Sequence, residues 1–197
     1  CSTAGELDPA TRGSIERTAQ QFASYALQGD AASLRQTSTS SLGASFGAIE
    51  ALIAEYKPDL AGGTAKTRSL YLLEARGPQP LDSAVFLCGV VNMPEATAFN
   101  LTNLPPGRYA IAIEDVTAPK TPYLLTQILK DEGGWKLAGF YLRPTQLAGH
   151  DAAWFLQKAR DFKARAETHN AWFYYLAAWD MTAPVDFMST RELERLV

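Results

Sequence analysis

The chain has 197 residues, of which 47% are hydrophobic and 20% charged, which suits one domain with a sizeable core. Its net charge is −3, and its 18 lysines and arginines are scattered singly. A nucleic-acid-binding protein gathers its cations on one face or in a run, because phosphate neutralisation supplies most of its affinity. The composition therefore argues against nucleic acid as a partner. No apolar run reaches the roughly 18–20 residues of a membrane-spanning helix.

The sequence starts at a cysteine, Cys1, followed by the short polar stretch STAGELDPATRG. This start resembles the mature N-terminus of a bacterial lipoprotein, in which a signal peptide is cleaved just before a cysteine that is then lipidated. The resemblance implies a tether over residues 1–10 and a lipid anchor at Cys1 as the contact with the membrane. It also implies a place in the bacterial cell envelope, facing the periplasm or the exterior. The alternative is an arbitrary chain boundary.

Helical periodicity dominates the first third of the chain. Asp8, followed by a proline, is a typical helix start, and apolar residues then recur every three or four positions up to Gln28. A second periodic segment covers 46–56 and is expected to end before Pro58. The Ser/Thr-rich stretch 37–41 between them is expected to be a loop or a helix end.

The middle of the chain changes to strand-like segments separated by short turns, which favours an antiparallel sheet. The run AVFLCGVV at 84–91 is apolar on both faces and predicts a central strand covered on both sides. Cys88 in this run is expected to be a small buried apolar residue without a disulfide partner, since Cys1 is assigned to lipid. The predicted strands are 67–75, 84–91, 96–101, 108–116, 123–130 and 135–142.

The last part of the chain is helical again. One helix is expected to begin at Asp151, a second to cover 171–181, and a short last one 189–196. The second lies in HNAWFYYLAAWDM and is apolar nearly all round, which predicts burial on most sides. We expect the sheet of the same chain to cover most of it, with a second chain as the alternative.

The order of helices, strands and helices predicts an α+β fold. In it, N-terminal helices pack on a curved, mainly antiparallel sheet, and a C-terminal helical hairpin follows. Residues 10–143 resemble the cone-shaped nuclear-transport-factor-like (SnoaL-like) fold in their element order and in the terminal hairpin TPYLLTQILKDEGGWKLAGFYL. The expected division is a tether over 1–10, a cone-like domain over 11–145, and a hairpin with a short last helix packed on it over 146–197.

The C-terminal helical pair resembles a single tetratricopeptide-type hairpin. One such unit cannot bury its own face, and no second copy follows at the family's period. The hairpin must therefore lean on the sheet domain or on a second chain. The residues that carry this resemblance are Phe155, Ala159, Phe162, Ala171, Tyr175, Ala178 and Pro184.

Motifs for catalysis are missing from the sequence. Two histidines, and no serine-nucleophile, phosphate-loop or metal-ligand pattern, lead us to expect no metal and no cofactor, with catalytic residues unassigned. Glu114 and Asp115 end an apolar strand, so one of them should face the inner side of the sheet. In enzymatic cone-like proteins acid–base groups line that side, by analogy of fold alone. A solvated pair at a strand end is the ordinary alternative.

The sequence therefore predicts a cell-envelope binding or scaffold domain without catalytic activity. A protein partner or a homodimer would use the C-terminal helices, through Trp172, Tyr174, Tyr175 and Trp179. The alternative is a small-molecule-binding or enzymatic member of the cone-like fold. Such a protein would take a small apolar ligand in a pocket between helices and curved sheet.

Overall fold

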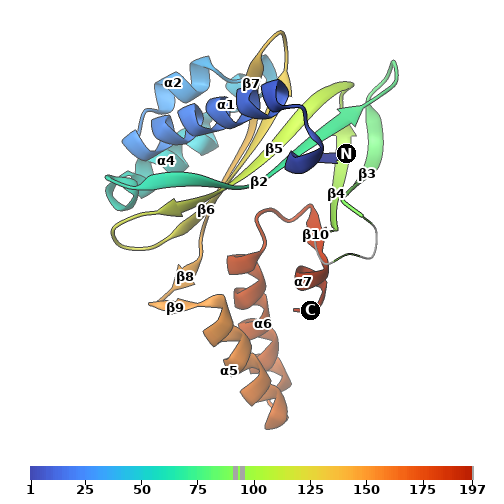
Figure 1. Cartoon of the computed structure of the whole chain (residues 1–197). Helices are drawn as coiled ribbons and strands as arrows, with labels where there is room; N and C mark the ends of the chain where they lie inside the picture. The colour runs from blue at the N-terminus through green and yellow to red at the C-terminus, as the bar shows by residue number, and fades with distance from the viewer. Residues whose placement is uncertain (91–92, 94–95, 197) are drawn as a thin grey trace.

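The chain folds as an α+β protein, as the sequence predicts, in a computed structural model that describes residues 1–90, 93 and 96–196 (Figure 1). The helices are α1 (Pro9–Gln28), α2 (Ala31–Gln36), α3 (Ser40–Ala44), α4 (Gly47–Leu60), α5 (Ala152–Ala164), α6 (Thr168–Thr182) and α7 (Arg191–Glu194), with a 3₁₀ turn at Ala4–Glu6. The strands are β1 (Ser2–Thr3), β2 (Thr64–Ala75), β3 (Leu81–Cys88), β4 (Thr97–Leu104), β5 (Gly107–Thr117), β6 (Tyr123–Asp131), β7 (Trp135–Pro144), β8 (Gln146–Leu147), β9 (His150–Asp151) and β10 (Met188–Thr190).

Helix α1 has the boundaries that its end residues predict. The Asp8 carboxylate accepts a hydrogen bond from the Thr11 amide at 2.9 Å, and Gly29 ends the helix with φ 72°. Helix α4, in contrast, continues through Pro58 to Leu60, so its expected end was wrong. Pro58 lies so near the end that its missing amide removes a hydrogen bond from the last turns alone.

A five-stranded antiparallel sheet, in the order β1-β2-β5-β6-β7, forms the centre of the molecule. Helices α1, α2 and α4 cover one face (Figure 1). Their buried side chains meet those of the sheet in one cluster, which includes Ile15, Phe22, Leu34, Phe46, Ile53, Leu72, Ala112 and Leu125. The other face is covered by a second antiparallel sheet, in the order β10-β4-β3, through a cluster that includes Tyr71, Leu73, Phe99, Ile111, Ile113, Val185 and Met188.

Strand β3 is an edge strand, so the expectation of a central strand covered on both sides was wrong. Val85 and Leu87 are 62% and 60% exposed, and Cys88 is buried. An apolar run alone does not distinguish a central strand from an exposed edge. The last residue of the predicted strand, Val91, lies outside the described residues.

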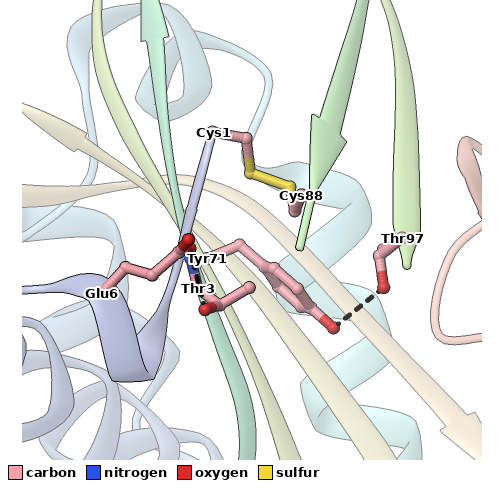
Figure 2. The surroundings of a disulfide bond; sticks show 6 residues. All are labelled: Cys1, Thr3, Glu6, Tyr71, Cys88 and Thr97. Carbon is pink, nitrogen blue, oxygen red and sulfur yellow. Dashed lines mark hydrogen bonds between the residues drawn. A yellow bond between two sulfur atoms is a disulfide. The ribbon is translucent and has the colours of Figure 1, made fainter. Parts of the chain in front are cut away.

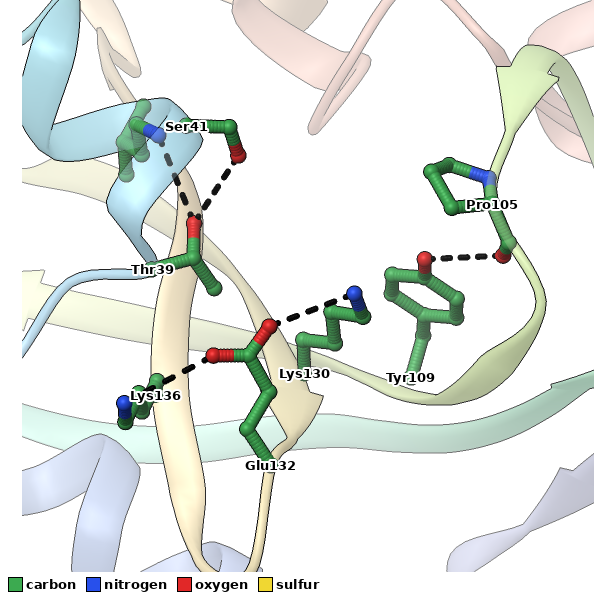
Figure 3. Close-up of polar contacts among 8 residues, drawn as sticks. Thr39, Ser41, Pro105, Tyr109, Lys130, Glu132 and Lys136 are labelled. Carbon is green, nitrogen blue, oxygen red and sulfur yellow. Dashed lines mark hydrogen bonds and ion pairs between the residues drawn. The ribbon is translucent and has the colours of Figure 1, made fainter. Parts of the chain in front are cut away.

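The acidic tip of the β6–β7 hairpin is an ion-pair network. Glu132 reaches Lys130 at 3.2 Å and Lys136 at 3.6 Å, as Figure 3 shows, while Asp131 pairs with Arg108 at 3.1 Å. These carboxylates hold the turn between two strands and are not gathered around a pocket. Partly exposed pairs of this kind contribute at most about 1 kcal/mol each.

Helices α5 and α6 form a hairpin that projects from the rest of the molecule (Figure 1). The expectation that the sheet would cover most of α6 was wrong, because Trp172, Phe173 and Leu176 are 56%, 50% and 41% exposed. The buried residues of the hairpin's own cluster are Phe155, Ala178 and Met181. The hairpin thus leaves an apolar helix face in contact with solvent.

Candidate functional site

The exposed face of α6 carries one continuous apolar stripe. Trp172, Tyr175, Leu176 and Trp179 recur at intervals of three and four residues, which places them on one side of an α-helix. Large aromatic side chains at such positions are the usual anchors of helix-in-groove recognition. We call these four residues the α6 stripe.

A groove runs along the α6 stripe, with Leu196 near the chain end as its second wall. Its volume is about 340 Å³, and its lining side chains are those of the stripe and Leu196. A volume of this size accommodates one or two large side chains of another protein. Isolated exposed apolar residues are normal on a protein surface, but a contiguous patch marks an interaction site.

Tyr174 lies on the opposite side of α6 and belongs to the interior of the hairpin. Its ring centroid is 5.6 Å from that of Phe155 and 4.9 Å from that of Phe162, both on α5. Of the four aromatic residues predicted for the partner surface, the structure therefore brings three together. Tyr174 instead packs the two helices against each other.

The hairpin is polar on its other side and on the edge of the stripe. Gln157, Arg160 and Lys163 on α5 are exposed, so solvent suits that face. His169 and Asp180, both exposed, lie beside the stripe near the two ends of α6. The apolar stripe thus lies on one side of the hairpin, with one charged or ionisable residue near each of its ends.

The segment after α6 fixes the hairpin to the body. Ala183 and Val185 are fully buried, and Arg143 on β7 donates to the Ala183 carbonyl at 3.2 Å. Arg143 also pairs with Asp186 at 2.7 Å. A firm attachment at the base positions the hairpin, while its length stays clear of the sheet.

The predicted carboxylate pair is split between two environments. Asp115 is half-exposed and forms a bidentate pair with Arg68, whereas Glu114 is fully buried on the side that the helices cover. Burial raises the pKa of Glu114 to about 7, and a hydrogen bond from Gln127 at 2.6 Å opposes that rise. Gln127 also donates to the Ala19 carbonyl of α1 at 2.8 Å.

A row of polar groups crosses the sheet at Glu114. Thr67 is its direct neighbour on β2, and Gln127 lies diagonally from it on β6, where it pairs with Ala112. Among the described residues, Thr67 Oγ1, Glu114 Oε1 and Gln127 Oε1 are buried without a hydrogen-bond partner. The row is enclosed by α1 and the sheet, so Glu114 is not positioned to meet a substrate. It is a buried structural group.

A disulfide joins Cys1 to Cys88 at the end of β3, with their Cα atoms 5.0 Å apart (Figure 2). Cys88 is buried as expected, but the expectation that it has no disulfide partner was wrong. Residues 2–3 pair with β2, so the segment expected to be a tether is attached to the sheet. Because a sulfur in a disulfide cannot carry a lipid, the disulfide and the predicted lipid anchor compete for the Cys1 sulfur.

A second pocket, of about 370 Å³, opens on the face of the sheet away from the N-terminal helices. Arg68 and Glu192 bring opposite charges to it, and Tyr71 brings its hydroxyl. The small-molecule alternative placed its pocket between helices and sheet, where Ile15, Phe22 and other apolar residues fill the space.

In the part of the chain that the structure describes, no group of three metal-binding side chains comes together. Within the same residues, no helix combines the length and the apolar character that crossing a membrane requires.

Leu176 and Leu196 are the groove residues that sequence reasoning did not select. Leu176 had a signal, because it completes the helical spacing of Trp172, Tyr175 and Trp179. No sequence pattern pointed to Leu196, because its place beside α6 depends on the tertiary fold.

No family model, no curated protein and no solved structure matches this chain. The resemblances to the nuclear-transport-factor-like fold and to a tetratricopeptide hairpin therefore stay predictions.

Proposed function

We propose that this protein is a non-catalytic binding module of the cell envelope that docks a helix of another protein chain on the α6 stripe. One observation carries the proposal: the stripe lies on a projecting helical hairpin with Trp172 and Leu176 exposed and Tyr175 and Trp179 partly exposed. Trp172 alone is 56% exposed, and the groove beside it is lined by apolar residues. A partner helix with its own apolar stripe has the chemistry that fits such a surface.

The disulfide supports the proposed location. Disulfides persist in oxidising compartments such as the bacterial periplasm and the cell exterior, and are rare in the cytosol. The Cys1–Cys88 bond therefore favours an extracytoplasmic protein.

A non-catalytic role is supported by the state of the ionisable residues selected from the sequence. Glu114 is enclosed between α1 and the sheet, and Asp115 is paired with Arg68. A general acid or base must come within hydrogen-bond reach of a substrate, which the position of Glu114 does not permit.

Site-specific photo-crosslinking in the producing cell tests the proposal. A photoreactive phenylalanine analogue at Phe173, beside the stripe, is expected to give a discrete covalent adduct with a protein chain. The same analogue at Gln157, on the polar side of α5, is the matched control and is expected to give none. Equal labelling from both positions, or none from Phe173, would contradict a docking role for this face.

A further inference from the structure

The α6 stripe is symmetric about its own midpoint. A tryptophan stands at each end, at Trp172 and Trp179, and Tyr175 and Leu176 fill the centre. A two-fold axis between Tyr175 and Leu176 superimposes the stripe on itself with the helix direction reversed. An isologous dimer places the same patch of both copies on a two-fold axis between them, so that residue i contacts residue j and j contacts i.

We infer that the occupant of the α6 stripe is the α6 stripe of a second copy of this chain, packed antiparallel about a two-fold axis that lies between the two helices, level with the midpoint of the stripe. The inference rests on the proposed function, since it names the partner of that same face. In this arrangement Trp172 lies over the partner subunit's Trp179, while Tyr175 meets the partner subunit's Tyr175 on one edge and Leu176 meets the partner subunit's Leu176 on the other. Leu196 borders the groove that receives the partner subunit's Trp172.

The charges beside the stripe fit the same arrangement. His169 and Asp180 lie on the same edge of α6, near its opposite ends. A two-fold axis brings like edges of antiparallel helices together. His169 then faces the partner subunit's Asp180, and the same contact repeats at the other end. An imidazole beside a carboxylate is a favourable pair, and its repetition fixes the antiparallel direction.

The polar side of the hairpin is also compatible with the dimer. The outward residues of α5, such as Gln157 and Arg160, stay in solvent when α6 meets its copy. The two hairpins together then form four helices with α6 in the middle, an arrangement in which apolar helix faces are buried and polar ones exposed.

The exposed apolar area of the α6 stripe sets the expected affinity of the dimer. Aromatic side chains bury about 150–250 Å² each, so the half-exposed residues of this face supply on the order of 400 Å² per copy. A standard stable interface buries about 800 Å² per partner. The face thus provides about half of that area, and we expect a dimer that dissociates at micromolar concentrations.

Sedimentation velocity of the purified full chain tests the inference, over roughly 1–300 µM to bracket a micromolar Kd. The wild type is expected to pass from monomer to dimer over that range. Leu176→Asp places a carboxylate at the centre of the interface and is expected to weaken association at least about tenfold. Ala153→Asp adds a carboxylate at an exposed position of α5 and is the matched control. It is expected to associate like the wild type.

A charge exchange tests the direction of the helices. His169→Asp is expected to weaken the dimer about tenfold, because two carboxylates then face each other, and adding Asp180→Lys is expected to restore it. Circular dichroism confirms that each variant folds. A wild type that stays monomeric up to the highest concentration overturns the inference, as does a dimer that neither Leu176→Asp nor His169→Asp weakens. If the dimer is excluded, crosslinks from Phe173 to a different protein would still support the proposed function. If those crosslinks are also absent, the proposed function and the dimer are both contradicted.

Discussion

Glu114 places a carboxyl group where water does not reach it. It is fully buried between α1 and the sheet, and its Oε1 has no partner among the described residues. Burial disfavours the charged form and raises the pKa of Glu114 to about 7 from an ordinary value of 4.5. Between pH 4.5 and about 7, the folded chain therefore binds more protons than the unfolded chain.

This difference makes stability depend on pH. The folded state holds the extra proton, so the contribution of Glu114 is fully favourable below pH 4.5 and is lost as pH rises through about 7. A shift of this size corresponds to about 3 kcal/mol of unfolding free energy. Glu114→Gln cannot ionise, and its amide can donate to the Gln127 oxygen. We expect the free energy of unfolding of the variant not to fall as pH rises from 4.5 to about 7. At pH 8 the variant should therefore be more stable than the wild type.

Urea unfolding at a series of pH values between 4 and 8 measures the effect. Asp82→Asn, which removes an exposed carboxylate on β3, is the control and is expected to keep the wild-type slope. If Glu114→Gln keeps that slope as well, the carboxyl group is ionised in the folded protein and the account of its burial is incorrect.

At the scale of elements, the disulfide attaches the first strand to the second sheet. Cys1 precedes β1, which pairs with β2 at the edge of the five-stranded sheet, and Cys88 ends β3. The bond closes a loop with a sequence separation of 87 residues. In the chain-entropy model a loop of that length removes about 4–5 kcal/mol of denatured-state freedom.

Removal of this bond should therefore be costly. Cys88→Ala is expected to lower the free energy of unfolding by up to about 4–5 kcal/mol, and Cys1→Ala by a similar amount, because both break one bond. The double variant should be no worse than either single one. If the protein purified from its natural membrane carries lipid on Cys1, Cys88→Ala will leave its stability almost unchanged, and mass spectrometry of the N-terminal peptide will show the lipid.

Local patterns explain which elements the sequence could predict. Helix α1 followed from its capping residues Asp8 and Gly29, and the antiparallel strands followed from apolar runs with short turns. Burial of Cys88 was also predictable, but its pairing with Cys1 was not, since no local signal links two cysteines so far apart.

The candidate site was predictable in part. The sequence showed that α6 is apolar nearly all round and needs a cover, and it selected Trp172, Tyr175 and Trp179. It did not show which surface packs on α6, because helical periodicity reports which faces are apolar and not where the neighbouring elements lie. The same limit applies to β3, whose apolar run became an exposed edge.

The whole molecule consists of a body with a sheet covered on both faces and a hairpin fixed to it at one end. The body has its own large apolar clusters, whereas the cluster of the hairpin has three buried residues, Phe155, Ala178 and Met181, and α6 leaves Trp172, Phe173 and Leu176 exposed. A helical pair of this size gains its stability from packing against another surface. The central claim is that the α6 stripe meets that surface on another chain.

The fluorescence of Trp172 and Trp179 tests this claim most directly. In a Trp135→Phe/Trp154→Phe background, these two indoles are the emitting tryptophans of the chain. If the stripe docks on its copy, their emission shifts to shorter wavelength as protein concentration rises through the micromolar range, and Leu176→Asp abolishes the shift. An emission maximum that stays at the long wavelength of a solvent-exposed indole at every concentration would contradict docking of the stripe on a second copy of this chain.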